Sequence, residues 1–147
     1  MDLSQALDFA AARQQGVLVT LQRNGRPQIS NILYVLSGEG CFQISVTDTR
    51  AKTRNLRRDS RVSLYVPGDT FWEWVVIEGS AELTAVAASP GDATVEELIA
   101  YYRQLAGEHP DWEDYRRAMV ADKRMIIRVR PERAYGQMAD QATLTPG

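Results

Sequence analysis

The sequence predicts a mainly β or α+β fold, an antiparallel barrel with peripheral helices that is formed by one domain of 147 residues. Three observations support this prediction. Short segments with strand-like alternation are separated by turn sequences. Helical segments interrupt them without the regular strand–helix alternation of a parallel sheet. Neither a linker nor an internal repeat divides the chain, whose length suits one domain with a sizeable core.

The first third of the chain predicts a helix followed by three strands. Residues 3–11 carry apolar side chains at helical spacing, and Gly16 is the expected stop. Asn24-Gly25 is a strong hairpin signal, and residues 37–40 form a second turn sequence. Joined by such short turns, the three strands should form an antiparallel meander. The expected strands are residues 17–21, 28–35 and 41–47.

The middle of the chain predicts a short basic helix between further strands. Residues 51–58 contain good helix formers without Pro or Gly, and Asp48 or Thr49 can cap the start of this helix. The segments after it return to strand alternation. The expected strands are residues 61–66 and residues 71–84, the second bent at Gly79.

The last third predicts two helices, one strand and a loose tail. Thr94 and Glu97 have the spacing of a capping box, which would open a helix that runs to about residue 105. Gly107 should end this helix. The remaining expected elements are a helix over residues 112–121, a strand over residues 125–130 that Pro131 stops, and a loose tail from about residue 139.

Composition excludes several classes of protein. The chain has 17 basic and 19 acidic residues, and its net charge of −2 argues against a general nucleic-acid binder. Cys41 and His109 are its single cysteine and histidine, which excludes an internal disulfide and a Cys/His zinc site, and no other metal site is expected. No apolar run is long enough to span a membrane. We therefore expect a soluble, cytoplasmic protein.

One segment, residues 50–61, concentrates the positive charge. It holds six of the 17 basic residues and one of the 19 acidic residues, so its net charge is 6 − 1 = +5, against 11 − 18 = −7 for the remainder. Such a segment on an acidic chain indicates an anionic ligand. The open choices for that ligand are a cofactor phosphate, a nucleic acid, or only solvent counter-ions.

Helical periodicity divides this basic segment into two sides. Lys52 falls near Leu56, the residue expected to face the core, and so leans toward the protein body. A lysine in the first turn, beside free N–H groups and the positive end of the helix dipole, favours a phosphate site. Arg50 can add a bidentate contact. For the other arginines, a solvated surface is an equally good interpretation; these are Arg54, Arg57, Arg58 and Arg61.

Two tryptophans and a polar strand segment are further candidates. Trp72 and Trp74 lie two apart in an expected strand and would project from one face. They can line a pocket for a planar ring, or pack in a core or a subunit interface. Gln28 and Ser30 share one face of their strand, and Asn31 points to the other. These polar groups suit the edge of a heterocycle, although a solvent-facing strand would show the same residues.

No catalytic motif is recognisable in the chain. It has neither a nucleophile constellation nor a phosphate-binding glycine loop, and His109 follows a helix end, where a structural or surface role is expected. Any redox or transfer chemistry must therefore come from a bound cofactor.

Two sequence segments carry a family resemblance. They are Gly-Arg-Pro-Gln-Ile-Ser-Asn at residues 25–31 and Arg-Ala-Lys-Thr-Arg-Asn-Leu-Arg-Arg-Asp at residues 50–59. Together they resemble the split β-barrel flavin/deazaflavin oxidoreductases, which are pyridoxamine 5′-phosphate oxidase-like proteins. The likeness extends through Glu78-Gly79 and Tyr135-Gly136, over nearly the whole chain. In particular, the chain is similar to the actinobacterial branch that uses the deazaflavin coenzyme F420.

The resemblance implies a split barrel that forms a homodimer with two cofactor sites at the subunit interface. Arg50, Lys52 and Thr53 would then bind the cofactor phosphate. The implied candidates for the cofactor's acidic glutamyl tail are Arg54, Asn55 and Arg57. The implied ring contacts come from Gln28, Ser30 and Asn31, with Ser45 and Thr47 below the ring, and with Trp72 and Trp74 near this pocket or reaching the partner's.

The same resemblance implies a reductase that transfers hydride from the reduced deazaflavin to an electron-poor conjugated small molecule, such as an enone, quinone, lactone or tetrapyrrole. Two alternatives stay open: an FMN-binding oxidoreductase, and a non-catalytic deazaflavin-binding protein. A nucleic-acid binder fits the acidic remainder of the chain poorly. Vitamin B6 oxidation is not expected, because the basic and aromatic residues that bind pyridoxal phosphate are not recognisable around residues 135–138.

Overall fold

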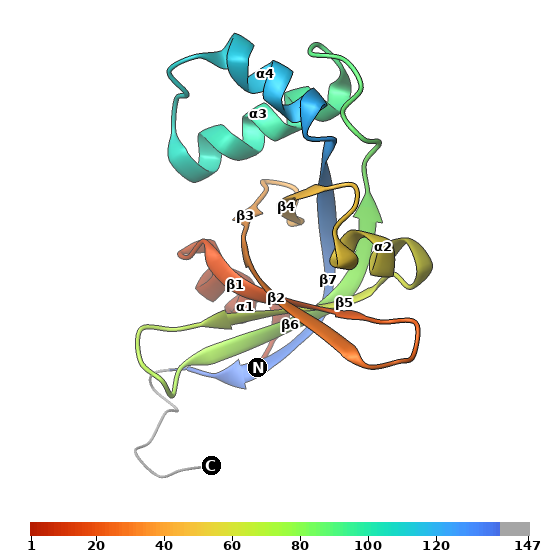
Figure 1. Ribbon diagram of the computed structural model, residues 1–147. Coiled ribbons are helices and arrows are strands. Elements are labelled where there is room, and N and C mark those ends of the chain that lie inside the picture. The colour runs from red at the N-terminus through yellow and green to blue at the C-terminus, as the bar shows by residue number, and fades with distance from the viewer. Residues whose placement is uncertain (139–147) are drawn as a thin grey trace.

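One antiparallel sheet curls into a half-barrel around an apolar core (Figure 1). The computed structural model describes residues 1–138, and within them the strands pair in the order β2-β1-β5-β6-β7-β4-β3. The predicted α+β split barrel with peripheral helices is confirmed. The strands are β1 (Gln15–Leu21), β2 (Pro27–Leu33), β3 (Val35–Leu36), β4 (Phe42–Thr47), β5 (Arg61–Pro67), β6 (Trp74–Leu83) and β7 (Arg124–Gln137). The helices are α1 (Leu3–Ala11), α2 (Ala51–Arg58), α3 (Ala93–Ala106) and α4 (Trp112–Ala121).

The second strand of the expected meander is divided into β2 and β3. The hairpin of β1 and β2 forms as predicted, with Leu18 opposite Ser30. Tyr34 then interrupts the expected strand over residues 28–35, because its ring is fully buried and its hydroxyl donates to the Ala10 carbonyl over 2.7 Å. The chain re-enters the sheet as β3, and β4 pairs with β3 and β7. The expected turn at residues 37–40 therefore forms, with Val35 opposite Gln43, but burial of Tyr34 separates β3 from β2, so the meander prediction is confirmed only in part.

A bulge bends the paired strands β6 and β7. The register shifts between Glu78 and Gly79, and Gly79 lies opposite Pro131. A Cβ atom on Gly79 would come within 2.0 Å of the Arg130 carbonyl oxygen, so glycine is required at this close approach. The predicted bend at Gly79 is confirmed, but the predicted stop at Pro131 is wrong. Proline is tolerated at a bulge, where the ladder does not need its missing N–H, and β7 continues to Gln137.

Glycine ends one of the two helices for which it is the predicted stop. Gly107 caps α3 with a φ of 84°, as predicted, and the predicted helix over residues 112–121 is confirmed as α4. By contrast, α1 ends at Ala11, and Gly16 lies inside β1. A Cβ on Gly16 would lie 2.9 Å from the Tyr65 carbonyl oxygen. The absence of a side chain at Gly16 therefore serves strand packing, and its predicted role as a helix stop is wrong.

The capping box predicted for α3 is not the one that forms. The Asp92 carboxylate accepts from the Val95 N–H over 2.9 Å and caps the helix one residue before its first turn. Thr94 instead donates its hydroxyl to the Ala85 carbonyl over 2.9 Å. Glu97 pairs with an arginine of β7. The capping prediction is wrong because an aspartate two residues earlier provides the better-placed acceptor.

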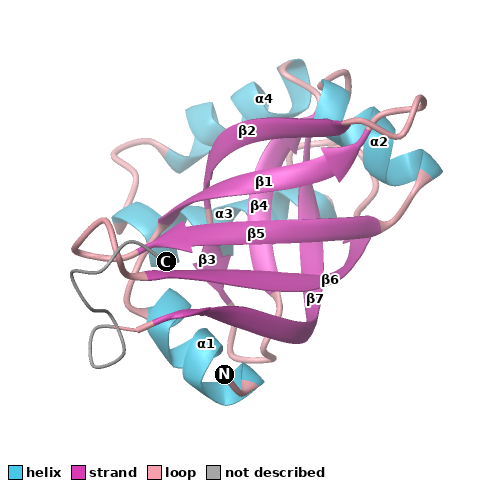
Figure 2. Cartoon of the chain, turned by 90° about the horizontal axis from the view of Figure 1, so that it is seen from below, coloured by secondary structure: helices cyan, strands magenta, loops and turns pink. Residues whose placement is uncertain are grey.

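The buried side chains form two clusters. The larger one fills the half-barrel, where Ala6 and Ala10 of α1 and Leu56 of α2 pack against the strands. The smaller one lies between the helices α3 and α4 and the sheet, around Leu98 and Ile126. Both helices stand at the end of the molecule that carries β3 and β4 (Figure 1). None of the helices within residues 1–138 crosses the outward face of β2, β1, β5 and β6 (Figure 2).

Two further expectations concern membrane-spanning segments and the end of the chain. No helix within residues 1–138 combines the length and the apolar character that crossing a membrane requires. The tail for which the sequence predicts a loose conformation, from residue 139, lies outside the described residues.

Candidate functional site

The start of α2 leaves backbone N–H groups open. Arg50 is the N-cap residue, and no side chain caps the helix, so the predicted cap by Asp48 or Thr49 is wrong. Asp48 instead pairs with an arginine in the last turn of the helix. The N–H groups of residues 51–53 find no acceptor within residues 1–138. These groups and the positive end of the helix dipole can together bind an anion.

Lys52 lies beside these open groups and leans toward the sheet, as predicted. Its side chain is half-buried, and its Nζ atom lies 3.5 Å from the Ser30 Oγ atom. Burial lowers the pKa of Lys52, and the nearby charges of Arg50 and Arg124 lower it further. No carboxylate within the described residues pairs with Lys52. The site therefore concentrates positive charge without a counter-ion of its own.

A pocket of about 340 Å³ opens next to Lys52, between β2, β4 and the helices α3 and α4. Two cationic side chains line it, and none of the aspartates and glutamates within residues 1–138 does. Aromatic and thioether groups from α3 and α4 form the opposite wall, which suits a planar molecule that carries negative charge. The lining residues are Asn31, Ile32, Leu33, Ser45, Lys52, Tyr101, Tyr102, Tyr115, Met119 and Arg124.

The fold brings several of the predicted ring contacts to this pocket. Ser30, Asn31 and Ser45 all lie at it or beside Lys52. Ser30 and Asn31 occupy opposite faces of β2, as the strand alternation predicts, and Asn31 is the more exposed. Gln28 lies further along β2, where its side-chain oxygen accepts from Thr20 over 3.3 Å. The Gln28 side chain therefore contacts β1 and is not among the residues that line the pocket.

Two predicted site residues hold α2 against the sheet. The Thr53 side chain is fully buried, and its hydroxyl donates to the Thr47 carbonyl over 2.9 Å. The Asn55 side chain is also buried and donates to the Thr20 hydroxyl over 3.1 Å. Thr47, another predicted site residue, ends β4, and its carbonyl is the group that accepts from Thr53. These bonds fix the position of Lys52 relative to the strands.

The arginines of the basic segment fall into two groups. Arg57 pairs with Asp48, Arg61 pairs with Asp59, and Arg58 donates to the Leu21 carbonyl. Within residues 1–138, the exposed side chains of the other two, Arg50 and Arg54, make no hydrogen bond or ion pair. The charge available to an external ligand is therefore concentrated at the start of the helix.

The two tryptophans lie away from this pocket within the chain. The strand expected over residues 71–84 begins only at Trp74, so Trp72 lies in the preceding turn and packs against Phe71. Their predicted projection from one strand face is therefore wrong. Trp74 stacks on Tyr65 and meets Tyr135 edge-on, at the opposite end of β5 from α2.

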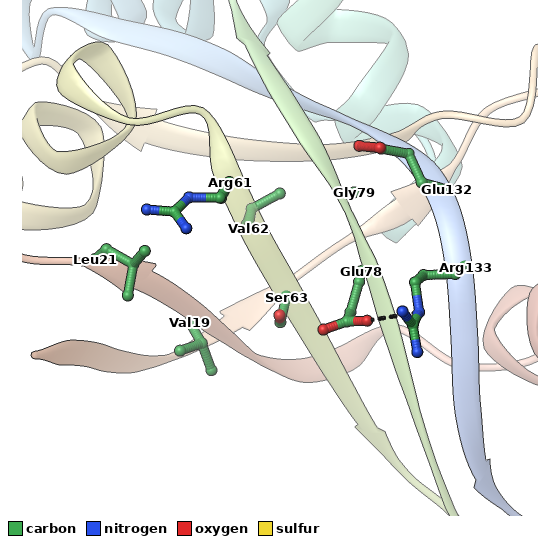
Figure 3. A pocket seen from close by; sticks show the side chains of 9 residues that line it. All are labelled: Val19, Leu21, Arg61, Val62, Ser63, Glu78, Gly79, Glu132 and Arg133. Carbon is green, nitrogen blue, oxygen red and sulfur yellow. Dashed lines mark ion pairs between the residues drawn. The ribbon is translucent and has the colours of Figure 1, made fainter. Parts of the chain in front are cut away.

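A second pocket of about 340 Å³ lies on the outward face of β1, β5, β6 and β7 (Figure 3). Its polar lining contains both signs of charge, and Glu78 and Arg133, neighbours on β6 and β7, pair over 3.0 Å at one side of it. Arg61 and Glu132 add one charge of each sign. A balanced lining gives an anion no net attraction, so the pocket at Lys52 is the better candidate site.

Arg124 and the three tyrosines were missed by the sequence reasoning. Arg124 begins β7, more than 70 positions after Lys52, and the tyrosines come from the helices in between. The only sequence signal is a basic residue at the start of an apolar strand, which is common on protein surfaces. Their proximity to Lys52 depends on the pairing of β7 with β4, which places Arg124 opposite Thr47.

Comparison with known proteins identifies the family. Residues 4–138 match the pyridoxamine 5′-phosphate oxidase family, and the chain belongs to it. This is a family of flavin-binding oxidoreductases with the split-barrel fold.

Solved structures share the fold at low sequence identity. The conserved hypothetical protein Rv2991 from Mycobacterium tuberculosis is 23% identical, with a TM-score of 0.72, over 100% of this chain and 92% of its own. An F420 reductase is 23% identical, with a TM-score of 0.62, over 88% and 95%. The haem storage protein HutZ from Vibrio cholerae is 17% identical, with a TM-score of 0.66, over 91% and 93%. One fold thus carries several functions, and the site must discriminate between them.

Proposed function

We propose that this protein is an oxidoreductase that uses reduced coenzyme F420 to reduce an electron-poor conjugated small molecule. One observation carries the proposal: Arg50, Lys52 and the open N–H groups of α2 converge beside a pocket that no carboxylate of residues 1–138 lines. The 23% identical F420 reductase adds support at the level of the fold. When bound, the reduced deazaflavin supplies the hydride that no side chain of the chain can supply.

The chain's own residues bind and orient in this proposal. Lys52 and the N–H groups of residues 51–53 hold the cofactor phosphate, and Arg50 adds a second charge at the entrance. Ser30, Asn31 and Ser45 offer hydroxyl and amide groups to the edge of a heterocycle. Thr53 acts from the core, by anchoring the first turn of the helix to Thr47. Tyrosine side chains from α3 and α4 exclude water from the far wall.

The choice between deazaflavin and FMN depends on the arginines beyond the phosphate site. An acidic tail requires cationic groups that are not already neutralised, and Arg54 meets this condition. Arg57 is a weaker candidate because Asp48 neutralises it, and Asn55 is buried. Arg54 together with Arg50 favours the more anionic cofactor.

We also propose that the active form is a homodimer. Cross-strand pairing lines up Val17, Tyr65, Val76 and Tyr135 on the outward face of the sheet. Ile29 on the edge strand β2 is 63% exposed. Exposed apolar side chains such as Ile29 and Tyr135 on this face support a subunit interface here. A second copy packed here would bring its Trp72 and Trp74, which do not reach the pocket of their own chain, closer to a neighbouring site.

Titration of the purified protein with both cofactors tests the proposal. We expect saturable binding of F420, followed by oxidation of its reduced form when an enone or quinone is added. Stoichiometric retention of FMN without saturable F420 binding would establish the FMN-binding alternative. Binding of F420 without turnover across enones, quinones, lactones and tetrapyrroles would establish a non-catalytic binding protein. Light scattering with Ile29→Glu as the variant tests the dimer, which should dissociate.

A further inference from the structure

We propose that Arg124 is a specificity-determining residue, which binds the carboxylate or phosphate of an anionic acceptor inside the pocket beside Lys52. This inference rests on the proposed function and names the class of substrate that the pocket takes. Arg124 is separate from the phosphate site at the start of α2, because it comes from β7 and contacts β4.

The first observation is that Arg124 has an unsatisfied donor. Its Nε atom is buried and has no hydrogen-bond partner, and no other buried side-chain nitrogen or oxygen within residues 1–138 is in this state. Its Nη1 atom reaches the Ser45 hydroxyl only at 3.5 Å. A buried donor without an acceptor is costly and rare, so it requires a specific explanation. An external oxyanion in the pocket can accept a charged hydrogen bond from this guanidinium.

The second observation is the contrast with the other arginines of β7. Arg128 pairs with Glu97 and Glu82, Arg130 with Glu82, and Arg133 with Glu78. Glutamates of β6 and α3 thus neutralise each of these cations, whereas no carboxylate within residues 1–138 pairs with Arg124. The missing negative charge at the pocket can be contributed by a ligand.

The third observation is the chemistry of the surrounding wall. The hydroxyls of Tyr101 and Tyr115 already donate to the carbonyls of Leu33 and Leu98, over 3.1 and 3.0 Å. Burial raises the pKa of Tyr115 to about 12, and it also raises that of Tyr101, so neither supplies negative charge near neutral pH. Together with Met119, their rings form an apolar wall for the body of a planar acceptor. Its anionic group would then face Arg124.

The backbone before Arg124 supports its placement. Lys123 adopts a φ of 52°, in the left-handed region that non-glycine residues rarely occupy. Its carbonyl accepts from the Asp48 N–H over 3.0 Å, which ties the start of β7 to the segment preceding α2. Arg124 is therefore held at a fixed position relative to Lys52.

Cinnamate and its neutral amide, cinnamamide, are a matched pair of probes, because they share a planar conjugated body and differ in charge. We expect the wild-type protein to bind cinnamate about tenfold more tightly than cinnamamide, as a charged hydrogen bond predicts. Arg124→Gln should abolish this preference, and Arg124→Lys should retain part of it. Arg130→Gln, the control on the same strand, should leave it unchanged, since Glu82 keeps Arg128 as its partner.

Calorimetric titration of each variant with the two probes, and separately with F420 and FMN, makes the test decisive. Retained cofactor affinity in Arg124→Gln with lost preference for cinnamate would support the proposal. Equal loss of cofactor affinity would overturn it and assign Arg124 to the cofactor phosphate. An unchanged preference in a folded Arg124→Gln protein would also overturn it. If neither cofactor binds the wild type, the proposed function fails, and the probe preference still tests Arg124.

Discussion

The basic residues at the pocket differ from the arginines of α2 and β7 that pair with carboxylates in how their charge is matched. Arg128 and Arg130 of β7, like Arg57 of α2, have carboxylate partners within the chain. Lys52 and Arg124 have none within residues 1–138 and lie close enough for Arg124 to lower the pKa of Lys52. Matched charges hold elements of the fold together, whereas unmatched charges in a pocket favour an external anion. Whether a basic residue stabilises the fold or can bind a ligand therefore depends on whether an acidic residue lies beside it, and not on the number of arginines.

Reversing the charge of Lys52 should have the largest effect. Lys52→Glu replaces attraction to the cofactor phosphate by repulsion, so we expect the affinity for F420 or FMN to fall by about 100-fold or more. Circular dichroism should show an unchanged fold, because Lys52 is not part of the core. Arg117→Glu, on the exposed side of α4, is the control and should retain affinity. Unchanged cofactor binding in Lys52→Glu would refute the phosphate site.

Removing a matched charge should affect stability and leave binding intact. Arg128→Leu leaves Glu97, whose side chain is 17% exposed, with Gln43 as its remaining partner at 3.0 Å. We expect the free energy of unfolding in urea to fall by about 2 kcal/mol. Adding Glu97→Gln should restore part of this loss, because it removes the unpaired charge. A fall in cofactor affinity without a loss of stability would contradict the distinction between paired charges that stabilise the fold and unpaired charges that bind the ligand.

As the pH rises, anion binding should weaken at a lower pH than it would with a lysine of ordinary pKa. Lysine is charged below its pKa, and burial and then Arg50 and Arg124 lower the pKa of Lys52. A bound anion favours the charged form, so its affinity should fall by up to about tenfold as the pH rises through this lowered pKa. Titration of phosphate binding against pH measures the effect. Lys52→Met should bind weakly at every pH, and the same pH dependence in this variant would exclude Lys52 as its source.

The smallest expected effect separates Arg54 from Arg57. Arg54→Ala should lower the affinity for F420 about threefold and leave FMN binding unchanged, because only F420 carries the acidic tail. Arg57→Ala should change either affinity less, since Asp48 already neutralises that guanidinium. High salt should remove the difference between the two variants. Equal losses in both variants would show that pairing with Asp48 does not withdraw Arg57 from the ligand.

Local signals predicted most of the elements and missed most of their connections. The Asn24-Gly25 hairpin and the end of α3 at Gly107 depend on backbone conformations that glycine itself permits, and they were predicted correctly. The bend at Gly79 was also predicted correctly, although a close approach of β7 is what requires glycine there. The course of β7 past Pro131 was not predictable locally, because the bulge opposite Gly79 makes proline acceptable there. The cap of α3 was predicted wrongly for a different reason: Asp92, and not Thr94, provides the side-chain acceptor at the start of the helix.

The sequence by itself determined the α+β class, the basic helix and the inward lean of Lys52, because periodicity and charge are local properties of the chain. Only the tertiary structure decided which of the clustered arginines are neutralised and which cation faces Lys52. Arg124 and Lys52 are 72 positions apart by their numbers (124 − 52), and strand pairing between β4 and β7 brings them to one pocket. Long-range pairing of this kind follows from burial of the whole sheet, which no short segment encodes.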